Sequence, residues 1–122
     1  MSTYRQHRDL ASERFDAAER LFQEEEYHTA AHLHINAAIN YHNALCQKYL
    51  KYIPSHKHHS DTGYLRELAP FIGPEFSKYQ DAYEFLMAHK SGADYGVGLS
   101  MGLAEQVRRR ALKIRAIAEP LL

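Results

Sequence analysis

The segment from residue 28 to residue 53 most constrains what this chain can fold into. It reads HTAAHLHINAAINYHNALCQKYLKYI and contains neither proline nor glycine, so nothing in it forces a helix to end. As one helix it would be about 39 Å long. Its apolar side chains form two stripes that together cover more than half of the circumference, Ala31, Ile35, Ala38, Leu45, Tyr49 and Tyr52 in one and Ala30, Ala37, Tyr41 and Ala44 in the other. Such a helix must be covered on several sides, and we expect it to be the central helix of an antiparallel bundle.

A second helix precedes the central one. A three-four spacing of apolar residues predicts a helix from about Thr3 to Glu25, and the short junction at Glu26 and Tyr27 leaves room only for a reversal of direction. The first two helices are therefore expected to form an antiparallel hairpin, in which the central helix continues until Pro54 ends it.

Proline and glycine divide the second half of the chain. A short third helix is expected through Leu65 and Leu68, and it should stop near Pro70. Pro74 is well placed to begin a fourth helix that extends to about Lys90. The segment SGADYGVGLS that follows is expected to be a glycine-rich loop.

A long final helix closes the predicted bundle. Ser100 is its expected N-cap, and its apolar stripe consists of Leu103, Val107, Ala111, Ile114, Ala118 and Leu121. The sequence contains no strand pattern and no internal repeat. We therefore expect an all-α fold with a single domain over residues 1–122, namely an antiparallel up-and-down bundle of four main helices plus one short connecting helix.

Composition excludes several classes of protein. No apolar run approaches the roughly 20 residues needed to span a bilayer, and the N-terminal segment MSTYRQHRD lacks the apolar core of a signal peptide. We therefore expect a cytoplasmic protein with no membrane contact. Cys46 is the only cysteine, which excludes an internal disulfide, and its place in the central helix favours a small buried apolar residue over a reactive thiol.

Charges of opposite sign alternate in blocks along the chain, although the formal net charge is zero. Residues 1–30 and 61–94 have an acidic excess, whereas residues 31–60 and 95–122 have a basic one. The cations of the two basic blocks are Lys48, Lys51, Lys57, Arg108, Arg109, Arg110, Lys113 and Arg115. A bundle could pair opposite blocks, or it could place the two basic blocks side by side as a patch for an anionic partner.

Histidine is unusually frequent, and two histidines near the start of the central helix have the spacing of metal ligands. His28 and His32 are four residues apart, as in helical zinc sites, and Glu25 with His28 forms the Glu-x-x-His pair found in di-iron bundles. Neither pattern has the further ligands it would need. We therefore expect polar residues at a helix start, with no metal and no cofactor.

His42 lies on the apolar face of the central helix, and Asn36 and Asn40 lie on nearby turns. Buried polar groups need hydrogen-bond partners. The pattern therefore predicts either a core histidine bonded to a tyrosine such as Tyr83 or Tyr95, or a small cavity that binds a ligand.

A second histidine cluster, His56, His58 and His59 with Lys57, follows the central helix. In an exposed loop these side chains could contact phosphate or capture a metal ion, or could simply be solvated. His58 or His59 could also contact Asp61 at the start of the third helix, which would make one of them structural.

Three segments of the chain resemble the HEPN domain family (higher eukaryotes and prokaryotes nucleotide-binding). RFDAAERLFQEEEYHTAAHLHINAAINYHNALCQKYL resembles the family's opening hairpin, KHHSDTGYLREL its His-containing entry to the third helix, and FLMAHKSGADYG, with Lys90, Asp94 and Tyr95, its K-x-x-x-D-Y segment. The resemblance covers nearly the whole chain. It implies an α-helical bundle that often dimerises and that, in many members, cuts RNA without a metal or binds nucleotides in toxin, abortive-infection and CRISPR-associated systems.

The ribonuclease members of the family carry an arginine followed after four to six residues by a histidine, and no arginine here has that partner. Arg20 and His28 come nearest but are one residue too far apart. The resemblance therefore favours a non-catalytic member that binds nucleotide, RNA or a partner protein. The candidate ligand-binding residues are His42, Asn36, Asn40, His58, His59, Arg108 and Arg109.

Two other functions stay open at this point. The chain could be a divergent metal-independent ribonuclease that uses His58 or His59 with one of the arginines at 108–110. It could also be a purely structural dimeric interaction protein. A homodimer is expected in either case, because the apolar stripes are more extensive than one small core can bury; they include Tyr4, Phe15, Ile117 and Leu121.

Overall fold

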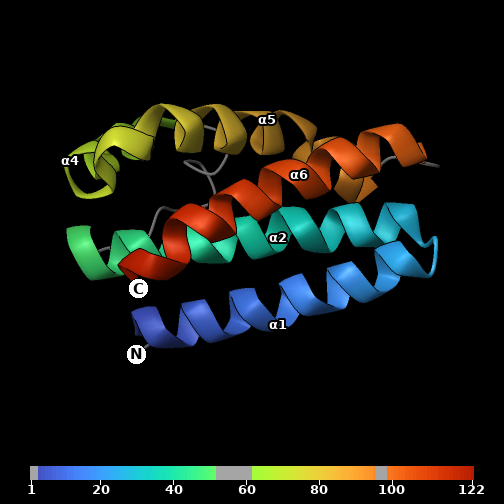
Figure 1. Cartoon of the computed structure of the whole chain (residues 1–122), viewed down its shortest axis with the longest axis horizontal. Coiled ribbons are helices and arrows are strands. Elements are labelled where there is room, and N and C mark those ends of the chain that lie inside the picture. Colours follow the sequence, from blue (N-terminus) through green and yellow to red (C-terminus); the bar gives the residue numbers. More distant parts are fainter. Residues whose placement is uncertain (1–2, 52–61, 96–98) are drawn as a thin grey trace.

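The computed structural model describes residues 3–51, 62–95 and 99–122, and this part of the chain is helical with no strand. Four long helices dominate it: α1 (Tyr4–Gln23), α2 (Tyr27–Leu45), α5 (Phe76–Tyr95) and α6 (Met101–Ala118). Figure 1 shows α1 and α2 as a hairpin, α6 lying across α2, and α5 on the far side of α6. The predicted all-α class with four main helices is confirmed.

The boundaries of the long helices differ from the predictions at several ends. The α-helix of α2 ends at Leu45 and continues as a π-helical turn, η1 (Cys46–Leu50), which stops at Lys51 in the left-handed conformation rather than at Pro54. Helix α5 begins at Phe76 and extends to Tyr95. The first half of the predicted glycine-rich loop is therefore helical, because a single glycine inside a helix costs only about 1 kcal/mol and packing can offset it.

The predicted short connecting helix is a series of short turns instead. The chain passes through the 3-10 helix η2 (Thr62–Leu68), the α-helical turn α4 (Ala69–Ile72) and the 3-10 helix η3 (Gly73–Glu75) before it enters α5. Pro70 lies in the first turn of α4 and does not end a helix. Proline is tolerated there because the first amides of a helix have no intrahelical acceptor. One further turn, η4 (Glu119–Leu121), follows α6.

Side-chain contacts give the directions of the first two helices. Phe22 packs edge to face on Tyr27 at the turn, and the Arg14 side chain donates to Asn40 much farther from it, so α1 and α2 run in opposite directions. The C-terminal parts of α2 and α6 meet where the Tyr41 hydroxyl donates to Glu119, across 2.8 Å. Helix α2 packs against α1, α5 and α6, so it has the central position that its apolar circumference predicts.

The core consists mainly of small and aromatic side chains. Alanines of α2 such as Ala31 and Ala38 are fully buried and allow close approach of the neighbouring helices, while Tyr41, Tyr79 and Tyr83 are the largest fully buried side chains. Phe15, expected to contribute apolar surface for a dimer, is 1% exposed within the monomer. In the described part of the chain, no helix is long and apolar enough to cross a membrane.

The α1–α2 turn places a glutamate where glycine is usual. The Glu25 amide donates to the Phe22 carbonyl oxygen and the Glu26 amide to the Leu21 carbonyl oxygen, which together form a Schellman motif. Glu25 takes the left-handed conformation of this motif, with φ of 64°. A residue with a Cβ atom is strained there.

We therefore predict that Glu25→Gly raises the free energy of unfolding by about 1 kcal/mol, because glycine adopts the left-handed conformation without strain. Urea titration of the two proteins measures the difference. Glu24→Gly is the matched control, since it removes the same charge at a residue with φ of −84° and should give no gain. A loss of stability in Glu25→Gly would contradict the prediction.

Candidate functional site

His42 is buried between α2 and α5, at 2% exposure. Its Nδ1 atom lies 2.8 Å from the Tyr79 hydroxyl oxygen, and its Nε2 atom lies 3.6 Å from the Cys46 sulfur. The imidazole also stacks on Tyr83, with ring centroids 4.2 Å apart. The hydrogen bond to a tyrosine is thus present with Tyr79 as the partner, whereas Tyr83 stacks on the ring.

The groups around His42 stay protonated near neutral pH. Burial raises the pKa of the Cys46 thiol to about 12, and burial also raises the pKa values of the Tyr79 and Tyr83 hydroxyls well above their usual range. Cys46 is therefore a small core residue, as its position predicted, and its thiol is not activated as a nucleophile. His42 lines neither of the two cavities described below.

We predict that His42→Ala lowers the free energy of unfolding by about 2 to 4 kcal/mol, because it removes a packed ring and leaves the Tyr79 hydroxyl without this partner. Thermal melting monitored by circular dichroism measures the change. The double variant of His58 and His59, which lie outside the described residues, is expected to melt close to the wild type. Equal melting temperatures for His42→Ala and the wild type would contradict the core role.

A second buried histidine, His34, connects α2 to an ion pair between α1 and α6. The Arg108 Nε atom donates to both carboxylate oxygens of Glu19, at 3.0 and 2.9 Å, and His34 Nε2 lies 3.3 Å from one of them. The His34 side chain is fully buried and packs against Phe15 and Phe22. A carboxylate only accepts hydrogen bonds, so Nε2 must carry the proton.

Burial lowers the pKa of His34 below its ordinary value of 6.5. Glu19 opposes this shift through its hydrogen bond and its charge, while the positive charge of Arg108 adds to it. The ring is therefore neutral near pH 7, and its contact with Glu19 is a hydrogen bond rather than a salt bridge. In the neutral ring Nδ1 is an acceptor, and it has no partner among the described residues.

The lowered pKa predicts an acid-sensitive contribution to stability. Below pH 6.5 the unfolded chain binds a proton at His34 that the folded chain does not, so stability is complete above pH 6.5 and decreases as the pH falls toward the folded-state pKa. Urea titrations between about pH 7.5 and pH 5 should show a shallower loss for His34→Phe than for the wild type. Parallel curves for wild type and His34→Phe would contradict the assignment.

Among the residues that the structure describes, the other predicted ligand-binding side chains have partners of their own and line no cavity together with His42. The Asn36 side-chain amide donates to the His32 carbonyl oxygen at 3.0 Å, and the Asn40 side-chain oxygen accepts from Arg14 at 2.8 Å. Arg109 donates to Glu105 at 2.8 Å on the exposed side of α6. Each of these three side chains is thus hydrogen-bonded to a neighbouring residue. Only Arg109 of the three lines one of the two cavities described below.

His28 and His32, which have the spacing of helical metal ligands, each have a hydrogen-bond partner of their own. His28 Nδ1 accepts a hydrogen bond from the Leu99 backbone amide at 3.4 Å, and His32 Nε2 lies 3.1 Å from the side-chain amide nitrogen of Asn36. No group of three or more metal-ligating side chains occurs among the residues that the structure describes. The loop cluster His56, His58 and His59 lies outside those residues.

Cationic side chains gather in a different place, a cleft between α5 and α6 that we call the cationic cleft. It has a volume of about 370 Å³ and is lined by Lys78, Asp81, Ala82, Arg109, Arg110 and Lys113. Arg110 packs over the Phe85 ring, with its guanidinium carbon 4.4 Å from the centroid. With four cations and one carboxylate on its walls, the cleft is suited to an anion.

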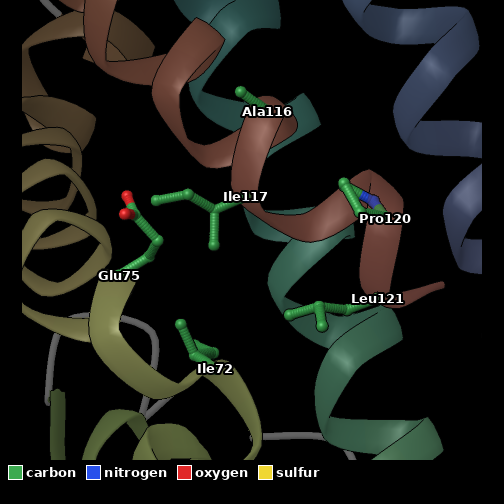
Figure 2. A pocket seen from close by; sticks show the side chains of 6 residues that line it. All are labelled: Ile72, Glu75, Ala116, Ile117, Pro120 and Leu121. Atoms are coloured by element: carbon green, nitrogen blue, oxygen red, sulfur yellow. The ribbon is translucent and has the colours of Figure 1, made fainter.

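An apolar pocket lies next to the cationic cleft, toward the C-terminal end of α6. Its volume is about 330 Å³, and it is lined by Ile72, Glu75, Ala116, Ile117, Pro120 and Leu121. In Figure 2 the side chains of Glu75 and Ile117 extend toward each other, while Ile72 and Leu121 lie below them in the view. Glu75 is the one charged residue among the described residues that line this pocket, and its carboxylate lies 3.6 Å from the Lys78 ammonium of the cationic cleft.

Sequence reasoning found part of the cationic cleft. Arg109 is one of the ligand-binding candidates from the sequence, and Arg110 and Lys113 belong to the same basic block. Lys78 lies in an acidic block, which the charge pattern does not single out. Lys48, which a patch of the two basic blocks would include, donates to the Leu121 carbonyl oxygen at 2.9 Å and does not line the cationic cleft. The sequence of α5 contains a signal for this wall of the cleft, because Lys78, Asp81 and Ala82 have the i, i+3, i+4 spacing of residues on one helix face.

Comparisons with known proteins give no relative for this chain, since no family model, no curated protein and no solved structure matches it.

Proposed function

We propose that this protein is a non-catalytic, HEPN-like module that binds single-stranded RNA or nucleotides through the cationic cleft. The observation that carries the proposal is the gathering of Lys78, Arg109, Arg110 and Lys113 around one cleft, with Asp81 as the one carboxylate among them. Phosphate groups are the anions that such a set of guanidinium and ammonium groups binds best.

Two features make these cations available to a ligand. The Arg109 side chain is 67% exposed, and its ion pair with Glu105 lies at the surface, where such pairs contribute little to stability. Exchange of Glu105 for a phosphate therefore costs little. The Lys78 side chain is 64% exposed, and its contact with Glu75 is equally open to water.

The proposed module is non-catalytic because the chain lacks the arginine and histidine spacing of the ribonuclease members. The ribonuclease alternative would need His58 or His59, which lie outside the described residues, and an arginine of residues 108–110. Arg108 already binds Glu19 through two contacts. No observation favours that alternative, and we expect no RNA cleavage.

The proposal includes an up-and-down topology of the HEPN type, a homodimer and a cytoplasmic location. The alternation of helix directions that this topology requires is supported by the α1–α2 hairpin. A dimer has less apolar surface available than the sequence pattern indicates, because Phe15 is buried in the monomer. Among the described residues, Phe71 and Met101 are the exposed large apolar side chains, at 43% and 57% exposure. A setting in prokaryotic defence or toxin-antitoxin systems rests on the resemblance alone.

The double variant Arg109→Gln with Lys113→Gln tests the cleft. For the wild type we predict that single-stranded RNA binds with an affinity that falls steeply as salt rises. Loss of two phosphate contacts should weaken binding at low salt and reduce the slope of log K against log salt by about 1.4. Fluorescence anisotropy with labelled oligouridine at several salt concentrations measures both quantities.

The matched control is Arg20→Gln with Arg66→Gln, which removes the same net charge from exposed residues outside the cleft. It should keep most of the wild-type slope. Equal losses in the two double variants would show that net charge, rather than the cationic cleft, determines binding. No RNA binding by the wild type at low salt would overturn the proposed function.

A further inference from the structure

The apolar pocket and the cationic cleft adjoin each other, and we call the two together the groove. On α6, Ala116 and Ile117 line the pocket and Lys113 lines the cleft, so the two walls are one helical turn, about 5.4 Å, apart. On the opposite side, Glu75 of the pocket and Lys78 of the cleft are in contact at 3.6 Å. A ligand that places a phosphate in the cleft can therefore place an attached group in the pocket.

The walls of the pocket favour a flat apolar group. Aliphatic side chains of Ile72, Ile117 and Leu121 surround it, and the volume of about 330 Å³ is at the lower end of small-molecule sites. A nucleobase has apolar faces and a polar edge, and it is joined to its phosphate through one sugar. Its faces suit the aliphatic walls, and its phosphate then points toward Lys78 and Lys113.

Glu75 determines which polar edge this pocket accepts. Among the lining residues that the structure describes, Glu75 alone carries a charge, and its carboxylate offers two oxygen acceptors and no donor. Guanine presents two adjacent donors, N1–H and the N2 amino group, on its Watson–Crick edge. Adenine and cytosine present one amino group next to an acceptor, and uracil presents a single N–H between two carbonyl oxygens.

We propose that the apolar pocket binds a guanine base, with Glu75 accepting hydrogen bonds from N1–H and N2–H while the attached phosphate lies in the cationic cleft. This inference rests on the proposed function and names its base preference. The ligand is a guanine nucleotide, either free or as one residue of an RNA strand. Both forms present the same base edge and the same phosphate.

The experiment compares GMP with AMP, CMP and UMP by isothermal titration calorimetry, with tripolyphosphate as a probe for the cleft alone. A bidentate contact to the correct base edge should make GMP bind at least about fivefold more tightly than AMP. Glu75→Gln, which has one acceptor oxygen fewer, should bring the GMP to AMP ratio close to one. Glu84→Gln, an exposed carboxylate of α5 outside the groove, is the charge-matched control and should keep the wild-type ratio.

A second variant tests the pocket itself. Ala116 is exposed on its wall, so Ala116→Trp can fill the space without disturbing the core. It should abolish the preference for GMP and leave tripolyphosphate binding unchanged. A uridine hexamer with one guanine at its 5′ end, compared with the same hexamer carrying adenine, shows whether the preferred source of guanine is RNA or the free nucleotide.

The outcomes separate this inference from the proposed function. Equal affinity of the wild type for GMP and AMP, or an unchanged preference in Glu75→Gln, would overturn the guanine assignment while binding of RNA and tripolyphosphate still supports the cleft. Absence of binding to every nucleotide, to RNA and to tripolyphosphate would overturn both. A preference for GMP that is lost in both Glu75→Gln and Ala116→Trp would establish the site.

Discussion

The burial of α2 on several sides is the constraint on which the rest of this structure depends. Every residue of α2 from Ala37 to Leu45 is buried, and α1, α5 and α6 are the helices that cover it. Each surrounding helix then has one face toward α2 and another toward water. The charged residues of α5 and α6 must occupy the outer faces, which is why a charged groove forms between these two helices rather than in the interior.

Burial of α2 also determines how its polar residues are used. His34, Asn40 and His42 face three different environments, because successive residues of a helix point about 100° apart. His34 meets the Glu19–Arg108 pair, Asn40 meets Arg14, and His42 meets Tyr79. The contacts of His34 and Asn40 reach α1, and the contact of His42 reaches α5. The polar side chains thus fix the register of helices that alanine packing alone would leave free to slide.

Apolar periodicity predicted the long helices, the central position of α2 and the cap at Ser100, whose hydroxyl accepts from the Leu103 amide. It predicted less well where helices end, because local breakers compete with packing. Gly92 lies inside α5 despite its low helix propensity, and Pro70 lies in the first turn of α4 instead of marking the end of a helix. A pattern of single residues cannot show which of these effects is larger, since the packing contribution depends on the partner helix.

The candidate site was harder to predict than the fold for a similar reason. His42 and Asn40 attract attention as polar residues in an apolar stripe, yet such residues are the ones whose hydrogen bonds the core itself must satisfy. Lys78 and Glu75 look like ordinary surface charges, and only the approach of α6 places them at the walls of a groove. In a small helical bundle with a closely packed interior, a ligand can enter only between the outer faces of neighbouring helices. The residues that would bind it therefore belong to the solvated side of each helix, where sequence patterns carry the least information.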